Sequence, residues 1–161
     1  MRLEIKASAL ILGGIFLALG RLLAGSWGNA LLFAAMLGAS LLLHECGHAF
    51  VAHAHGVEVK AIGFSAAGAY TRRSLSTSKG VELQAASAGP MVNLAIGIAL
   101  MLLPGKIAAT VATCNLLLCA TNLLPIPPSD GWRMWKLAAT PGAISGCAFS
   151  GSSAAPESDR P

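Results

Sequence analysis

Four long apolar stretches dominate this chain and leave it few ways to fold. They cover residues about 7–24, 30–54, 84–103 and 107–124, and short polar joints separate them. A helix of about 20 residues crosses roughly 30 Å of hydrocarbon, so each stretch is long enough to span a membrane. Only 11% of the residues are charged, whereas soluble domains average about 25%. The sequence therefore predicts an all-α membrane protein with about four transmembrane helices and excludes a water-soluble enzyme.

Basic residues gather on one side of this predicted membrane. Arg2 and Lys6 precede the first helix. Further basic residues on that side include Lys60, Arg72, Arg73, Lys79, Arg133 and Lys136. Lys106 and Arg21 lie on the opposite side, so the positive-inside rule makes both termini and the loop 55–83 cytoplasmic. This topology accounts for the net charge of +4 without a nucleic-acid partner.

The second apolar stretch contains an ionisable group of the kind that lipid disfavours. It reads His44-Glu45-Cys46-Gly47-His48, and a carboxylate at mid-bilayer costs roughly 2.5–3.5 kcal/mol on insertion scales. On a helix, two histidines four residues apart share a face and can bind one Zn²⁺, while the adjacent glutamate handles a water proton. We predict a metal site with His44 and His48 as ligands and Glu45 as general base.

A catalytic zinc site needs a third protein ligand and an open position for water. Among the acids after residue 58, Glu82 lies at a loop boundary, and Glu157 and Asp159 belong to a polar terminal segment. Asp130 remains. Three prolines within 125–128 prevent a regular helix before it, and irregular backbone near a membrane requires surrounding protein or a water-filled cavity. Asp130 follows the fourth helix on the cytoplasmic side, so it can meet the two histidines at one level.

Gly89 and Pro90 interrupt the third apolar stretch. We expect them to break that helix near its cytoplasmic end, because proline deletes a backbone hydrogen bond and crowds the preceding turn. Asn93 lies one turn onward, and its amide would be poorly placed facing lipid. The residues alone leave two roles open for Asn93, a tie between helices or a place near the catalytic centre.

Three segments together resemble the signatures of the site-2 protease family of intramembrane zinc metalloproteases. They are HECGH at 44–48, AGPMVN at 88–93 and NLLPIPPSDG at 122–131, in the family's order. The resemblance covers roughly residues 40–136. The compact chain is similar to the small bacterial members that lack inserted PDZ or CBS domains, including the sporulation-factor-processing type. Ser129 departs from the pattern where an aliphatic residue is usual, and Trp132 departs where a small one is usual.

This resemblance implies a zinc metalloendopeptidase that cleaves peptide bonds in or near transmembrane segments of other membrane proteins, in regulated intramembrane proteolysis. One Zn²⁺ per chain would be bound by His44, His48 and Asp130. The weaker candidates for the neighbourhood of the substrate or transition state are Gly89, Pro90, Asn93 and Asn122. The expected location is the bilayer of a bacterial cell, as a multi-pass protein with its N-terminus and site opening on the cytoplasmic side.

The loop 56–83 is expected to contain short strands. Residues 57–62 alternate apolar and polar side chains, and three glycines follow them. The resemblance implies that about 63–71 receives an extended substrate by strand addition, while a simple cytoplasmic cap fits the same pattern. We assign 1–140 to a protease domain. The tail 141–161 is small, polar and proline-containing, so we predict it to be disordered.

Several other features carry less chemistry. The first apolar stretch exceeds the roughly 7–15 residues of a signal-peptide core, so we expect a retained helix there. The four cysteines contain no C-x-x-C pair, which disfavours a disulfide framework. His55 follows His48 by about 10 Å along a helix, too far to bind the same ion, and His53 is read in the same way as an interfacial histidine.

Two other functions would keep these residues. A proteolytically inactive membrane adaptor would retain the fold, but the intact Glu45 argues against it. A metal-transport or metal-sensing membrane protein would place histidines along an ion path and would need several sites. One full ligand set is visible in the sequence, which favours the protease.

Overall fold

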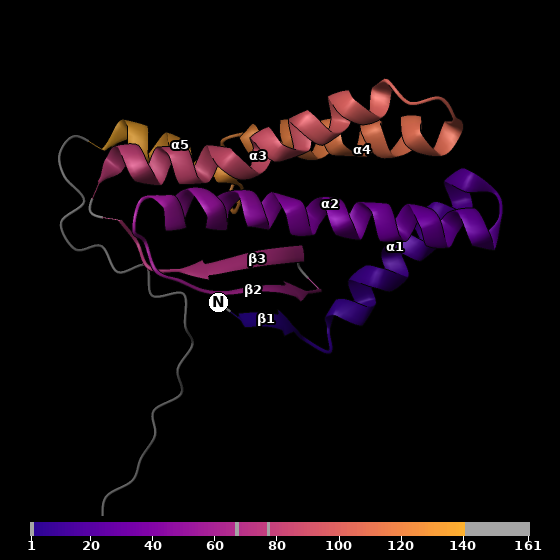
Figure 1. Cartoon of the computed structure of the whole chain (residues 1–161), viewed down its shortest axis with the longest axis horizontal. Coiled ribbons are helices and arrows are strands. Elements are labelled where there is room, and N and C mark those ends of the chain that lie inside the picture. The colour runs from indigo at the N-terminus through magenta and orange to yellow at the C-terminus, as the bar shows by residue number, and fades with distance from the viewer. Residues whose placement is uncertain (1, 67, 77, 141–161) are drawn as a thin grey trace, which may run out of the picture.

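The computed structural model describes residues 2–66, 68–76 and 78–140. Its helices and strands are β1 (Arg2–Ile5), α1 (Ala9–Ala24), α2 (Trp27–Ala54), β2 (Val59–Ser65), β3 (Gly68–Arg73), α3 (Lys79–Met101), α4 (Lys106–Leu123) and α5 (Asp130–Ala139). Figure 1 shows α2 between the sheet on one side and the group of α3, α4 and α5 on the other. The predicted disorder of 141–161 lies outside the described residues.

Three helices in the described part are long and apolar enough to cross a membrane, namely α2, α3 and α4. Ser26 and Ser78 accept hydrogen bonds from backbone N–H groups in the first turns of α2 and α3, which explains why both helices begin before the predicted apolar runs. α1 has 16 residues, about 24 Å at 1.5 Å per residue, less than the hydrocarbon thickness. The mostly helical fold is therefore confirmed, with three candidate membrane spans in the described residues, and the fourth span stays a prediction.

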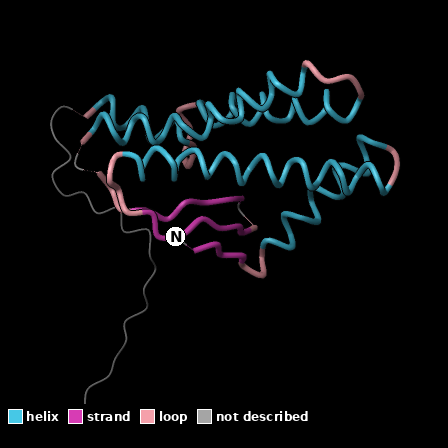
Figure 2. Tube along the Cα trace, viewed as in Figure 1, coloured by secondary structure: helices cyan, strands magenta, loops and turns pink. Residues whose placement is uncertain are grey.

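A small three-stranded sheet in the order β1-β2-β3 packs against α2 (Figure 2). The predicted strands in the loop are β2 and β3, which pair antiparallel. β1 was not predicted from the sequence; it pairs parallel with β2 from Arg2↔Ala61 to Ile5↔Phe64. Four residues are too few for a periodic pattern, so only the partner strand reveals them. The sheet therefore joins the N-terminal segment to the loop instead of lying wholly within it.

Pro90 lies inside α3, which runs without interruption through Lys79–Met101. The prediction that Gly89 and Pro90 break this helix was wrong. Both residues are buried, and α3 packs along α2 on one side and α4 on the other. Contacts along the whole helix hold it together despite the hydrogen bond that proline removes.

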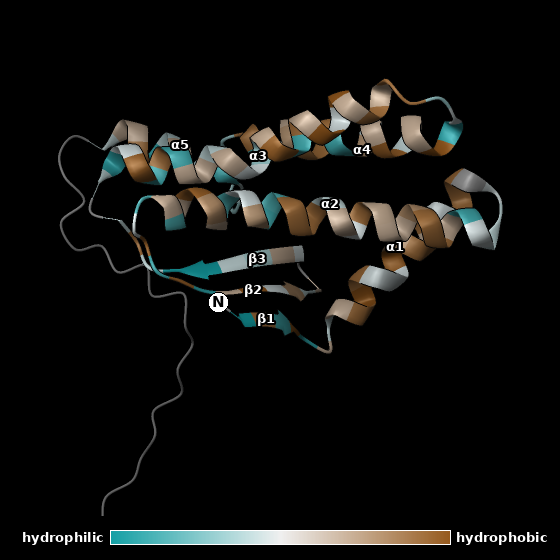
Figure 3. Cartoon of the chain, viewed as in Figure 1, coloured by the Kyte–Doolittle hydropathy of each residue, from teal (hydrophilic) through white to brown (hydrophobic). Residues whose placement is uncertain are grey.

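The helices share an apolar core with a polar tie beside it. Phe33 and Leu37 of α2 pack against Val111 of α4. Next to them, the amide nitrogen of Asn115 donates to the Ser40 hydroxyl at 3.1 Å and to the Val111 carbonyl at 2.9 Å. Figure 3 shows hydrophobic residues along the long helices, many of them exposed, as suits contact with lipid. This packing fixes α2 and α4, which position the site.

Candidate metal and catalytic site

One face of α2 presents His44 and His48, and Glu45 lies beside them. All three residues are buried, with 5%, 6% and 8% of their surfaces exposed for His44, His48 and Glu45. The Nε2 atoms of the two histidines lie 3.1 Å apart, as the spacing of four residues on a helix predicts. The sequence thus brings two imidazole nitrogens to one point inside the protein.

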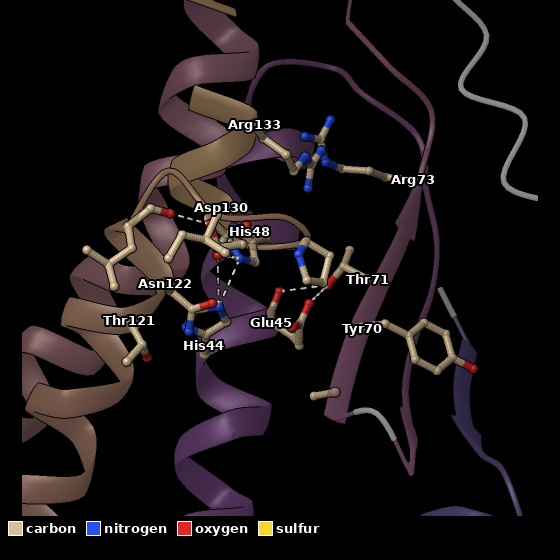
Figure 4. A pocket seen from close by; sticks show the side chains of 15 residues that line it. His44, Glu45, His48, Tyr70, Thr71, Arg73, Thr121, Asn122, Asp130 and Arg133 are labelled. Atoms are coloured by element: carbon tan, nitrogen blue, oxygen red, sulfur yellow. Dashed lines mark hydrogen bonds and ion pairs between the residues drawn. The ribbon is translucent and has the colours of Figure 1, made fainter. Parts of the chain in front are cut away.

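Asp130 reaches the same point from the other end of the chain. α4 ends at Leu123, and an irregular turn returns the chain so that α5 begins at Asp130. Its Oδ2 atom lies 3.3 Å from His44 Nε2 and 3.2 Å from His48 Nε2 (Figure 4). Within the described residues these three form a group able to hold a metal ion.

Ser129 and Gly131 flank Asp130, and both residues support the start of α5. The Ser129 hydroxyl accepts a hydrogen bond from the Trp132 N–H at 3.1 Å, which caps α5. A side chain at Gly131 would collide with the backbone of Leu123. The departure from the family pattern at Ser129 therefore still yields a capped helix that carries Asp130 in its first turn.

The donor set fits a zinc ion. Tetrahedral zinc has metal–nitrogen and metal–oxygen distances of about 2.0–2.1 Å, which place neighbouring ligand atoms about 3.3 Å apart. The observed separations among the ligand atoms of His44, His48 and Asp130 are 3.1, 3.3 and 3.2 Å. Burial alone raises the pKa of Asp130, but hydrogen bonds that the ring Nε2–H groups donate to its carboxylate outweigh burial and hold that pKa well below its usual range; a metal ion would take the place of those ring protons. The carboxyl group is therefore in the ionised form that binds metal.

α3 supports the two histidines from behind. His48 Nδ1 lies 2.6 Å from the Ala85 carbonyl, an acceptor, so the Nδ1–H donates to it and Nε2 is left to face the cluster. One turn onward, a Cβ atom at Gly89 would stand 2.6 Å from His44 Nε2 and would also collide with the His48 ring. Glycine is therefore required at 89 for α3 to approach the ligands.

Thr71 of β3 holds Glu45. Its hydroxyl lies 2.7 Å from Glu45 Oε2 and 3.1 Å from the Glu45 carbonyl. This contact was not predicted from the sequence, because a threonine within a strand matches no motif. The one available signal was the expectation that strands of this loop lie beside the site. Thr71 orients the carboxylate and leaves its second oxygen, Oε1, without a bond to Thr71.

The side chains of His44, Glu45, His48, Thr71 and Asp130 line a cavity of about 610 Å³ (Figure 4). Its walls come from α2, β3 and the segment 121–133. The apolar wall residues include Leu124, Ile126 and Pro128. This volume is within the range of small-molecule sites.

The four weaker candidates for the neighbourhood of the substrate do not all line the cavity. Asn122 lines the cavity. Asn93 and Pro90 are fully buried and do not line it, and neither amide atom of Asn93 has a hydrogen-bond partner in the described part of the chain. Gly89 lies against the ligands, as described above. The proposed roles of these residues near substrate stay predictions.

The fold and the site together define a helical membrane protein with a buried histidine–histidine–aspartate group. The family model described as "Peptidase family M50" matches residues 32–107 of this chain. "Zinc metalloprotease MJ0392" of Methanocaldococcus jannaschii is 33% identical over 110 residues, which cover 63% of this chain and 32% of that protein. "Putative zinc metalloprotease sll0528" of Synechocystis sp. is 34% identical over 145 residues, covering 79% of this chain and 38% of that protein.

A solved structure supports the same assignment. It is the "Site-2 Protease from Methanocaldococcus jannaschii", with a TM-score of 0.66 and 28% identity, and the match covers 84% of this chain and 66% of that one. The chain is therefore similar to the peptidase M50, or site-2 protease, family. It spans about a third of the length of the curated relatives it matches.

Proposed function

We propose that this chain is an intramembrane zinc metalloprotease that hydrolyses peptide bonds in or near transmembrane segments of other membrane proteins. The observation that carries the proposal is the His44, His48 and Asp130 group with Glu45 beside it, at the wall of one cavity. The names of the relatives support this activity, and the helices α2, α3 and α4 support a membrane location. Residues 1–140 would make up the protease domain.

One Zn²⁺ per chain would be held by His44, His48 and Asp130. When bound, zinc polarises a peptide carbonyl and lowers the pKa of a water ligand to about 7. The chain supplies the rest of the chemistry. Glu45 would take a proton from the attacking water at Oε1, the oxygen not bonded to Thr71, and pass it to the leaving amine. The cavity would admit the water that hydrolysis consumes.

The substrate would bind as an extended segment along β3. The sheet order leaves β3 at an edge of the sheet within the described residues. Ala69, Tyr70 and Thr71 of this strand line the cavity, so a peptide paired with the edge would pass the site. We place the cavity opening and the N-terminus on the cytoplasmic side, because the basic residues gather there.

Metal analysis tests the ligand set. Purified chain is expected to contain about one zinc per chain, and Asp130→Ala is expected to lower this value well below one, because two histidines alone leave the site without its anionic ligand. The matched control is Glu58→Ala, an exposed acid outside this group, which should keep the metal. Elemental analysis of the detergent-solubilised proteins is the measurement. Equal zinc content in Asp130→Ala and the unaltered chain would remove Asp130 from the site.

Thr71→Val is expected to lower kcat about tenfold, because the Glu45 carboxylate loses the hydrogen bond that orients it. Thr71→Ser keeps the hydroxyl and should restore most of the rate. Cleavage of a single-pass reporter by equal amounts of each variant is the measurement, with bound zinc determined in parallel. If the valine variant cleaves as fast as the unaltered chain at equal zinc content, Thr71 does not position Glu45.

A further inference from the structure

Two arginines lie at one end of the cavity, beside Asp130. Arg73 comes from β3 and Arg133 from α5, and both line the cavity. Figure 4 shows their guanidinium groups close together, and the nearest acid to both is Glu82. The proposed hydrolysis uses neither of them, so their charges need a separate explanation.

Arg73 is neutralised by a closed ion pair. Its Nη1 and Nη2 atoms donate to the two carboxylate oxygens of Glu82 at 2.7 and 2.8 Å, a two-point pairing. Ser76 adds a backbone N–H bond to Glu82 at 2.7 Å. The side chains of both partners are buried, with 5% and 3% exposed. This pair therefore holds β3 and its following turn against α3 and offers no free charge to a ligand.

Arg133 is in a different state. Its nearest acidic oxygen among the described residues belongs to Glu82, at 3.9 Å, and that carboxylate is already bonded twice by Arg73. The Arg133 side chain is 44% exposed. The two arginines and one glutamate carry a net charge of +1, and the partly exposed Arg133 side chain lines the cavity.

The other acids around the cavity are engaged elsewhere. Asp130 contacts His44 and His48, and Glu45 is bonded by Thr71. Arg133 is thus a cation of the cavity wall that still has free donors, and a guanidinium group matches a carboxylate through two parallel hydrogen bonds.

α5 sets the distance between the backbones of Arg133 and Asp130. Arg133 lies three residues after Asp130 on α5, where side chains face the same way with Cβ atoms about 5–6 Å apart. Its backbone N–H donates to the Ser129 carbonyl at 3.3 Å, within the capped first turn. An extended peptide advances about 3.3 Å per residue. A group bound by Arg133 therefore belongs to a residue near the scissile bond.

We propose that Arg133 binds a carboxylate close to the cleavage site and, where that carboxylate is a side chain of the intact substrate, sets the sequence preference. This inference rests on the proposed protease function. The carboxylate has two sources, an Asp or Glu side chain of the intact substrate or the new terminal carboxylate of the cleaved peptide. Both present the same planar, two-oxygen anion.

The first experiment scans charge along the substrate. A single-pass reporter that the unaltered chain cleaves is prepared with Asp, Asn or Lys at each of the four positions on either side of the cut. At one of these positions, the unaltered chain should show a KM about tenfold lower for Asp than for Asn. In Arg133→Gln this ratio should fall to about one with kcat little changed, Arg133→Lys should retain part of it, and Arg133→Glu should prefer Lys.

Lys136→Gln is the matched control, because it removes an exposed cation one turn further along α5 and outside the cavity lining. It should keep the preference for Asp. The second experiment addresses the product: a cleaved peptide with a free C-terminal carboxylate should inhibit the unaltered chain more than its amidated form. The side-chain source predicts an effect in the scan alone, and the terminal source predicts an effect in the inhibition alone.

A binding measurement separates this inference from the protease function. The Glu45→Gln variant should co-purify with more of the Asp reporter than of the Asn reporter. The double variant that also carries Arg133→Gln should co-purify with equal amounts of the two reporters. If reporter cleavage is the same with and without Glu45, the protease function fails. If cleavage depends on Glu45 but Arg133→Gln leaves the scan, the inhibition and the co-purification unchanged at normal zinc content, the inference about Arg133 is overturned and the protease function stands.

Discussion

Glu45→Gln is expected to lower kcat for a single-pass reporter by about 10²–10⁴-fold while bound zinc stays at about one per chain. The range is that of general-base catalysis by a positioned side chain. The amide of glutamine has nearly the shape of the carboxylate and can still accept a hydrogen bond from Thr71, which lies 2.7 Å from Glu45 Oε2. The substitution therefore removes the basic oxygen and little else.

The experiment co-expresses the chain with the reporter and follows the cleaved fragment over time, with zinc measured on the purified protein. Glu58→Gln is the control, because this acid is exposed and lies outside the cavity lining. Unchanged cleavage in Glu45→Gln would rule out Glu45 as the base and favour another source of the observed hydrolysis. If Glu45→Gln lost both its bound zinc and its cleavage activity, Glu45 would instead have a role in holding the metal.

Some ligands of the site are close in sequence and others are distant, and the two kinds are predicted in different ways. His44 and His48 are related by a helical spacing, and such a spacing fixes their geometry before any tertiary contact is known. Asp130 is distant in sequence, and it was selected because few acids at membrane depth compete with it. The structure brings it to 3.2–3.3 Å from both histidines.

The supporting contacts could not be predicted in the same way. Thr71 reaches Glu45 because β3 packs on α2, and Ala85 accepts from His48 because α3 crosses behind it. Neither residue belongs to a periodic pattern or a recognisable spacing. β1 was missed for a related reason, since its pairing with β2 is visible only in three dimensions.

Pro90 illustrates the opposite error, in which a local rule was applied too strongly. Proline weakens an isolated helix by removing a hydrogen bond, but α3 is held along its length by α2 and α4. The adjoining Gly89 was read as a helix breaker for the same local reason. Its actual role is set by its neighbours, because α3 can approach the histidine rings only where it carries no side chain.

Gly89→Ala is therefore expected to weaken zinc binding by about 10–100-fold or more, and to lower cleavage accordingly. A methyl group at this position would stand 2.6 Å from His44 Nε2 and would also overlap the His48 ring. Either the rings turn away from Asp130 or α3 moves back and loses the contact between Ala85 and His48. Changes of that kind around metal ligands typically cost 10–100-fold in metal affinity.

Competition with a zinc-binding dye measures this affinity without any substrate. Gly80→Ala is the matched control on the same helix, because the nearest atom to a Cβ at this position lies 3.8 Å away. Overpacking typically costs about 1–3 kcal/mol of stability, so thermal unfolding of both variants without metal is compared as well. A Gly89→Ala protein that is folded and binds zinc as tightly as Gly80→Ala would show that the two histidines do not bind metal in the arrangement described.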